Sequence, residues 1–256
     1  MIKWPFFKKK KVEDIKQEEK KTDNKEKIKR EITSEEIFFE NLEKLRKEDP
    51  LIGAKIGAKY IFNRMLEGMK DKRGVHIQSL LCALGSLAGY SCQASVRNEF
   101  IEKNGLEEKE VFNIIKCNDG SIYYFGDYIN KLLAEGQYSI WSLSAGVASH
   151  LGLKELIDLG DIFRYTAKTV GSSEFWIPRV TEHDRAGDIP INYVKGLWPI
   201  FLPIIKKYCD KPDEWSILFG LAVQETMLFG KDIIDSKTAL LIVMESAVPM
   251  SKIDLK

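Results

Sequence analysis

IQSLLCALGSLAGY, residues 77–90, is the longest apolar-rich run in the chain. Almost all of its side chains are apolar or small, so a helix formed here would have no polar face and would be buried on all sides. Small residues within it would let the backbone of a neighbouring helix come close. These small residues are Ala83, Gly85, Ser86, Ala88 and Gly89. We therefore predict a central helix over residues 75–103, followed by a stop at Asn104-Gly105.

Helical patterns continue on both sides of this run. A capping box at residues 33–36 opens a helix, and a second helix is expected over 51–69. Later in the chain the predicted helices span 138–151, 153–170, 191–208, 213–229 and 236–249. Pro199 and Pro203 predict that the helix over 191–208 is kinked or split. We expect a mainly α fold, with one multi-helix domain over residues 34–256 and one β-hairpin.

The hairpin is predicted between residues 111 and 125. Its two strands, 111–117 and 121–125, are rich in branched and aromatic residues, and Asp119-Gly120 suits a two-residue type I′ turn. That turn would place Cys117 opposite Ile122. A lone hairpin is marginally stable in water, so we expect this one to lie on helices or to find a further strand.

Residues 1–33 differ from the rest of the chain in charge. They hold twelve Lys and Arg against seven Asp and Glu, whereas residues 34–256 hold 27 against 31. Few apolar side chains follow residue 11, so burial cannot offset the entropy of ordering, and we predict a disordered, Lys-rich tail. The mildly acidic remainder gives no field that attracts nucleic acid, so we expect no nucleic-acid partner.

The sequence has the features of a cytoplasmic protein. A membrane-spanning helix needs about 20 consecutive apolar residues, and the run at 77–90 is shorter and contains Gln78 and two serines. Residues 1–11 lack the apolar core of a secretory signal. The four cysteines lie far apart without a CxxC spacing, which favours reduced thiols over a disulfide framework.

The first eleven residues, MIKWPFFKKKK, combine aromatic rings with lysines and no acid. Aromatic rings settle at a bilayer interface, and each lysine near an anionic leaflet adds about 1 kcal/mol of attraction. This pattern predicts weak, salt-sensitive contact with an anionic membrane surface, which would be peripheral at the inner membrane face; a merely solubilising tail is the alternative. The residues expected at the surface are Trp4, Phe6, Phe7, Lys8, Lys9, Lys10 and Lys11.

Residues 172–190 lose the helical period. Unstructured loops longer than about 12 to 15 residues are uncommon in compact domains and often carry function. Our hypothesis is that this loop and the hairpin form a binding surface for a protein partner or a second copy, without catalysis or a cofactor. The predicted aromatic and arginine anchors are Tyr123, Tyr124, Trp141, Trp176, Arg179 and Arg185.

A metal-dependent reaction is the alternative to binding. The motifs for nucleotide cradling, serine hydrolysis and zincin chemistry are missing from the sequence. His150, His183 and Asp184, followed by Asp232 or Asp235, occur in the order seen in HD-type phosphohydrolases. Such a cluster could hold a divalent metal that activates water. In those enzymes the His-Asp pair sits at a helix end, whereas here it lies in a loop. The plainer interpretation is a solvated charged loop or a local ion pair of Glu182, Asp184, Arg179 and Arg185.

Glu245 follows six consecutive apolar residues in the last predicted helix. A buried carboxylate has a raised pKa unless a partner stabilises its charge. If Glu245 is buried, we therefore expect an arginine or a backbone group beside it rather than a substrate.

Four segments together resemble an uncharacterised bacterial family of mostly helical cytosolic proteins. They are GSLAGYSCQ, NDGSIYYFGDYIN, YSIWSLSAG and ESAVPMSKID. The resemblance covers residues 75–256 and implies one helical domain in a bacterial cytosol. It implies no activity.

Overall fold

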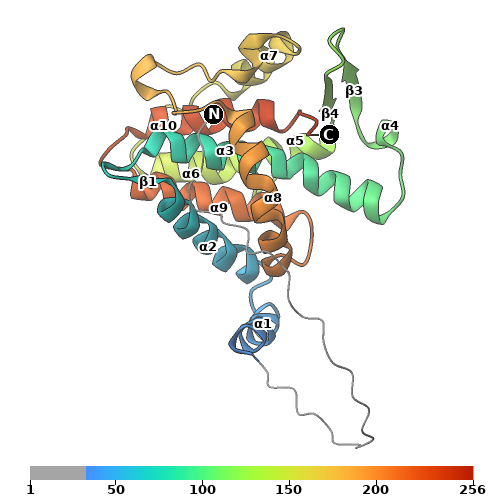
Figure 1. Ribbon diagram of the computed structural model, residues 1–256, viewed down its shortest axis with the longest axis vertical. Helices are drawn as coiled ribbons and strands as arrows, with labels where there is room; N and C mark the ends of the chain where they lie inside the picture. Colours follow the sequence, from blue (N-terminus) through green and yellow to red (C-terminus); the bar gives the residue numbers. More distant parts are fainter. Residues whose placement is uncertain (1–32, 256) are drawn as a thin grey trace, which may run out of the picture.

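The computed structural model describes residues 33–255, and most of them are helical (Figure 1). The mainly α fold predicted from the sequence is therefore confirmed. The elements in chain order are α1 (Ser34–Leu45), α2 (Ile52–Met69), β1 (Lys70–Asp71), β2 (Gly74–Val75), α3 (Ile77–Val96), η1 (Arg97–Lys103), α4 (Glu108–Val111), β3 (Asn113–Lys116), β4 (Ile122–Phe125), α5 (Asp127–Asn130), η2 (Lys131–Glu135), α6 (Ile140–His150), α7 (Leu159–Thr169), η3 (Ser173–Trp176), η4 (Glu182–Asp184), α8 (Pro190–Tyr208), α9 (Glu214–Phe229) and α10 (Ser236–Met250). The predicted disordered tail, residues 1–33, lies outside the described residues except for Thr33.

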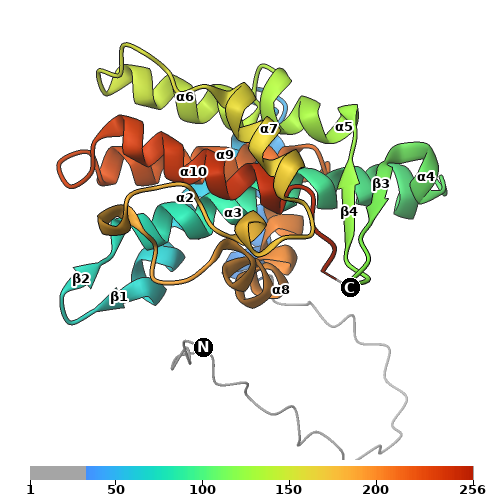
Figure 2. The ribbon, with the colours of Figure 1, turned by 90° about the horizontal axis from the view of Figure 1, so that it is seen from above.

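Helix α3 is the central element, as its composition predicts. Every residue of α3 except Tyr90 and Ala94 is buried. It packs against α10 and α9 along its length and against α8, which crosses it (Figure 1). Figure 2 shows α3, α10 and α6 running side by side, and α2 packs against α9. The surrounding elements therefore shield nearly all of α3, a helix with no polar face, from water.

Two glycines of α3 set its distance from α10. A Cβ atom added at Gly89 would lie 2.0 Å from the carbonyl oxygen of Ala247, and one added at Gly85 would lie 2.8 Å from that of Val243. Both pairs are spaced by four residues, so the two helices touch backbone to backbone over a full turn. The small residues of α3 therefore serve the close helix approach that the sequence predicts.

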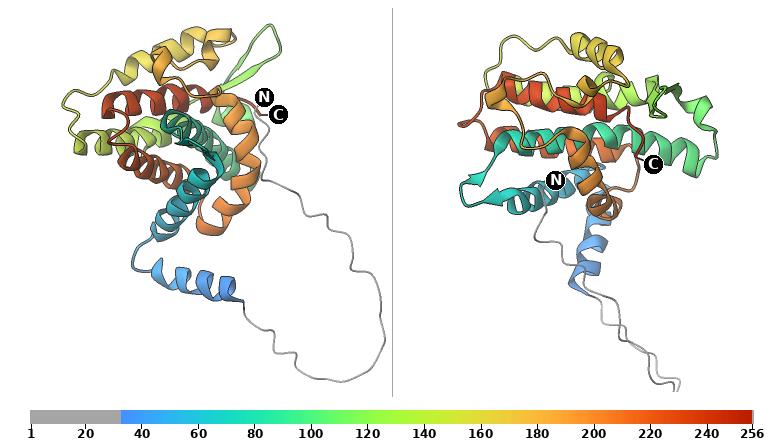
Figure 3. Two further views of the ribbon diagram at one scale, coloured as in Figure 1. Left: turned by 60° about the vertical axis from the view of Figure 1, so that its left-hand side comes forward. Right: turned by 45° about the horizontal axis from the view of Figure 1, so that its top comes forward.

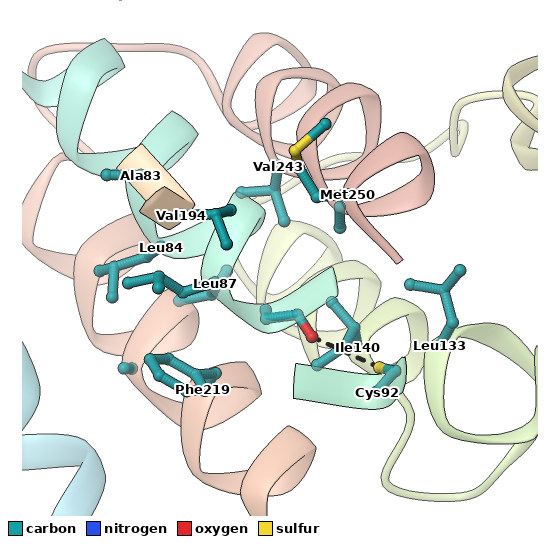
Figure 4. Packing of buried hydrophobic residues seen from close by; sticks show 14 of the residues in the cluster. Ala83, Leu84, Leu87, Cys92, Leu133, Ile140, Val194, Phe219, Val243 and Met250 are labelled. Atoms are coloured by element: carbon teal, nitrogen blue, oxygen red, sulfur yellow. Dashed lines mark hydrogen bonds between the residues drawn. The ribbon is translucent and has the colours of Figure 1, made fainter. Parts of the chain in front are cut away.

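Buried side chains from the surrounding helices meet around α3. Figure 4 shows Leu84 and Leu87 of α3 facing Val194 of α8, Phe219 of α9 and Val243 of α10. The cluster of buried apolar residues extends from α2 to Ile253, just beyond α10. Burial at this scale supplies the main favourable term in folding. Helix α1 is separate, because its one buried residue, Leu42, is not part of this cluster.

The predicted hairpin is present, but its predicted register is wrong by one residue. Strand β3 pairs with β4 so that Lys116 lies opposite Ile122 and Ile115 opposite Tyr123. The turn has three residues rather than two, because the Gly120 N–H donates to the Cys117 carbonyl and Gly120 has φ +85°. A type I turn followed by a left-handed glycine is the usual geometry of a three-residue hairpin loop.

Within the described residues the hairpin gains no third strand, but it pairs with the residues that follow α10 through a single bridge. The Tyr124 N–H donates to the Lys252 carbonyl at 2.8 Å, and Tyr123 and Ile253 form an antiparallel bridge. A second, smaller hairpin of β1 and β2 was not predicted, because two residues a strand leave no periodic pattern.

Several helix boundaries differ from the predictions. Helix α7 begins only at Leu159, because the Asp158 side chain accepts a hydrogen bond from the Asp161 N–H and caps the helix there. Residues 97–103 continue α3 as a π-helix. Helix α8 is not split, since it runs unbroken through Pro199 and Pro203.

No helix within residues 33–255 has the length and apolar character needed to cross a bilayer.

Gly89→Ala should lower the free energy of unfolding by about 3 kcal/mol, near the upper range for overpacked cores, because a methyl group there collides with the α10 backbone. Gly146→Ala on α6 is the matched control, because nothing lies within 4 Å of a Cβ at that position. It should raise stability by about 0.5–1 kcal/mol through helix propensity. Urea unfolding followed by circular dichroism measures both; equal effects would contradict the close contact.

Candidate functional site

Residues 170–189 connect α7 to α8 and form the candidate site; we name them the α7–α8 segment. The segment contains only two short 3₁₀ turns, η3 and η4. Figure 3 shows it passing over α10 and α3 on the outer face of the helical body. Long irregular connections held on a rigid scaffold commonly carry binding residues.

An ion pair between the partly exposed Arg179 and the buried Glu245 fastens the middle of the segment to α10. The Arg179 Nη2 atom lies 2.7 Å from Glu245 Oε1, and the Arg179 backbone N–H donates to Glu245 Oε2 at 3.2 Å. Glu245 is buried, and its partners are an arginine side chain and a backbone N–H, the two kinds of partner expected from the sequence. Arg179 also contacts Asp161 at 2.8 Å and lies 4.1 Å from the centre of the Tyr165 ring. Although burial opposes it, hydrogen bonds to Glu245 and Asp161 raise the pKa of Arg179, which keeps the guanidinium charged.

Two further contacts hold the ends of the segment. Near its C-terminal end the Gly187 N–H donates to Ser79 Oγ at 2.8 Å, and the Nδ1 atom of His76 lies 2.7 Å from the same oxygen. Near its N-terminal end a Cβ atom at Gly171 would lie 2.9 Å from Cys117 Sγ, so the segment touches the hairpin turn. The segment is therefore held at its middle and at both ends, which makes its shape largely preformed.

The segment also contacts the hairpin through aromatic rings. The Phe175 ring lies 4.9 Å from that of Tyr123 and 5.0 Å from that of Trp176, in edge-to-face geometry. Pairs of this kind contribute about 0.5–1.5 kcal/mol beyond their area. The hairpin and the loop thus come together, as the sequence hypothesis proposes.

A cavity of about 300 Å³ lies between the segment and the helices below it. Cys82 of α3 and Ile242 of α10 line it from the body. Ile177, Val180 and the charged Arg185 line it from the segment. Burial raises the pKa of the Cys82 thiol to about 11, so the thiol is protonated at neutral pH and a poor nucleophile. The Cys82 sulfur is therefore a neutral part of the cavity wall.

A second cavity, of about 340 Å³, lies on the other side of Arg179. Asp158, Asp161 and Glu245 contribute carboxylates to its lining. Each already has a cationic neighbour: Arg164 lies 3.1 Å from Asp158, and Arg179 pairs with the other two. The charges of this second cavity are therefore largely satisfied within the protein.

The six predicted anchors divide between three places. Trp176, Arg179 and Arg185 belong to the segment, and Tyr123 contacts it. Tyr124 points to the opposite face of the strand, where its hydroxyl contacts Glu108 and Asp254 at 3.3 Å each. Arg97 lies 4.6 Å from the centre of the Tyr124 ring. Trp141 lies on α6, half-buried against the core, and takes part in none of the ring pairs found within residues 33–255.

The residues of the metal alternative are placed differently. His150 is exposed at the end of α6 and His183 is exposed in η4. The Asp184 carboxylate accepts a hydrogen bond from the Thr181 hydroxyl at 2.6 Å. The part of the chain that the structure describes contains no group of three His, Cys, Asp or Glu residues able to hold a metal ion. Arg179 pairs with α7 and α10 rather than with the acids of its own loop, which corrects the local ion-pair interpretation.

Lys252 is a buried cation that the sequence analysis missed. Its side chain is 1% exposed, and its Nζ atom contacts Asn130 Oδ1 at 3.1 Å. The Phe125 and Phe163 rings lie 5.3 and 5.6 Å away. Burial lowers the pKa of Lys252 to about 8. No signal in the sequence around it predicts this, because a lysine between Ser251 and Ile253, with Asp254 next along the chain, normally lies in solvent.

Comparison of the chain with family models, with curated proteins and with solved structures found no match. The resemblance to a bacterial family therefore stays a prediction, and the site must be interpreted from its own geometry.

Glu245→Ala should lower the free energy of unfolding by about 1–2 kcal/mol, because it removes the main partner of Arg179, which is partly exposed and keeps its contact with Asp161. A double-mutant cycle with Arg179→Ala should give a coupling energy of about 1–2 kcal/mol, discounted because Arg179 is partly exposed. The exposed pair of Arg164 and Asp158 is the control, with a coupling below about 1 kcal/mol. Equal coupling in both cycles would contradict the proposed role of the pair of Arg179 and Glu245.

Lys252→Met should stabilise the protein at neutral pH and remove the Lys252 contribution to the pH dependence of its stability. The folded pKa of Lys252 is about 8 against an ordinary value of 10.5, so the unfolded chain binds the proton more tightly. The contribution of Lys252 to the free energy of unfolding should therefore fall by roughly 3 kcal/mol as the pH drops from 10.5 to 8. The buried thiols of Cys82, Cys92 and Cys209, whose pKa values are raised, act in the opposite direction but equally in wild type and variant, so the difference between the two proteins isolates Lys252. Chemical denaturation across this range measures the slope, with exposed Lys195→Met as control. An unchanged slope in Lys252→Met would refute the assignment.

Proposed function

We propose that the protein acts by binding, and that the α7–α8 segment with its cavity is the docking site for a segment of a partner protein. The observation that carries this proposal is apolar exposure at the cavity's edge. Ile177 is 48% exposed and Ile189 38% exposed, and both line the cavity. Exposed apolar side chains around a preformed apolar hollow are typical of an interaction surface.

A polypeptide fits this surface better than a small molecule does. A small ligand could fill a hollow of about 300 Å³ but would leave Ile177 and Ile189 in water. A partner chain can insert one apolar side chain into the hollow and cover both isoleucines with its neighbours. The docked segment therefore needs a large apolar residue in a locally extended or helical stretch.

Arg185 supplies a polar condition for the partner. It is exposed, it lines the cavity, and it forms none of the ion pairs found within residues 33–255. Asp184 and Asp188 also line the cavity, but their carboxylates accept hydrogen bonds from Thr181 and from the Ile189 backbone. A carboxylate next to the apolar residue of the partner would pair with Arg185 and set the orientation.

Residues 1–11 support a second proposal, contact with an anionic membrane surface. It rests on their composition, five lysines with Trp4, Phe6 and Phe7, since these residues lie outside the described part of the chain. A cytoplasmic protein held weakly at the inner face of the membrane would fit this composition. Metal-dependent hydrolysis by His150, His183 and Asp184 gains no similar support from the described residues.

Selection from a random peptide library on the purified full chain tests the docking site. Selected peptides should share a large apolar residue next to an acid. Their affinity should fall about tenfold or more in Ile177→Ser and in Arg185→Glu, which remove the apolar rim and reverse the rim charge. Lys195→Glu, an exposed charge reversal on α8, should leave it unchanged. Peptides without these features, or insensitive to both rim substitutions, would overturn the proposal.

A further inference from the structure

Helix α1 presents an uncovered apolar face. Ile37, Phe38 and Leu45 are 48%, 40% and 46% exposed. They lie within about 100° of one another around the helix, because successive residues turn by about 100° and these positions are one and seven residues apart. Figure 1 and Figure 3 show α1 standing away from the body of helices. We name these three side chains, with the exposed Tyr60 of α2, the α1 patch.

The orientation of α1 is fixed, so the patch is held outward. Arg46, just after the helix, donates to the Tyr208 carbonyl at 2.6 Å and pairs with Asp210 at 2.7 Å. Lys207 pairs with Glu35 at 2.6 Å. The Tyr208 ring lies 6.3 Å from that of Phe38 and 5.7 Å from that of Tyr60, so the rings form a continuous surface.

Helix α1 and the residues just after it carry more acids than bases. Residues 34–49 contain six Asp and Glu against three Lys and Arg. Glu35 and Glu43 pair with Lys207 and Arg46, whereas Glu40 forms none of the ion pairs found within residues 33–255. An apolar face beside these carboxylates suits a partner that combines aromatic side chains with positive charge.

Such a partner exists in the same chain. Residues 1–11 carry Trp4, Phe6 and Phe7 together with five lysines and no acid. Residues 12–32 join them to Thr33, which caps the first turn of α1. This connection of 21 residues can span at most about 70 Å, far more than the roughly 18 Å length of a 12-residue helix. A short covalent connection gives an effective concentration of the order of millimolar, so even a weak contact would be populated.

We propose that residues 1–11 bind the α1 patch of their own chain, with their aromatic side chains on Ile37, Phe38 and Leu45 and their lysines near the acids of α1. The bound segment is unavailable to a membrane surface, so the two contacts compete. This proposal does not depend on the α7–α8 segment, and its failure would leave the docking site untouched.

Photo-cross-linking of the full chain tests the contact. With p-benzoylphenylalanine in place of Phe6, irradiation should link position 6 to residues 34–60 of the same chain, as located by mass spectrometry. Mixing ¹⁵N-labelled with unlabelled chains separates links within a chain from links between two copies. Links mainly between copies, or scattered over the whole surface, would overturn the proposal.

Substitutions on the patch supply the control. The pair Phe38→Ser and Leu45→Ser should lower the yield of these links several-fold, while Ile233→Ser, at a side chain that is 65% exposed beyond α9, should not. Circular dichroism checks that the helices persist in each variant. A yield insensitive to the patch substitutions would overturn the inference. Phosphatidylglycerol vesicles should lower the yield where phosphatidylcholine vesicles do not; the absence of that difference would overturn the membrane contact alone.

Discussion

The contact between the backbones of α3 and α10 is the constraint on which the rest of the structure depends. Gly85 and Gly89 allow the two helices to touch at Val243 and Ala247, and any side chain at Gly89 would push them apart. Contact this close fixes the rotation and the axial position of α10 as well as its distance. Glu245 lies between the two contact points, so the same constraint fixes where its carboxylate emerges.

That position explains why an acid is retained inside an apolar helix. The Glu245 carboxylate meets both the side chain and the backbone of Arg179, and so it joins a long irregular connection to the most rigid part of the fold. An ion pair of this kind adds little net stability compared with apolar residues of the same size. It does specify one arrangement of the α7–α8 segment, since Arg179 would lack an equivalent partner in any other arrangement. The contacts of the segment with Glu245 and with Ser79 therefore determine the shape of the cavity.

The sequence predicted the features that depend on composition and local spacing. The central helix follows from its lack of a polar face, and the capping box of α1 from two side chains three residues apart. The partner of Glu245 was predicted in kind but not in identity, because the arginine lies 66 residues away. The predicted hairpin register was wrong because the sequence Asn118-Asp119-Gly120 is compatible with both a two-residue and a three-residue turn. Lys252 is buried because the C-terminal residues pair with β4, and no local sequence pattern predicts that pairing.

The four thiols differ in their accessibility, and this has a chemical consequence. Burial raises the pKa of Cys82, Cys92 and Cys209, so all three stay protonated and shielded from oxidants and alkylating reagents. Cys117 is only half-buried, at the turn where the hairpin meets Gly171. Oxidation or alkylation of the folded chain should therefore begin at this one sulfur, and the added bulk would press on the start of the α7–α8 segment.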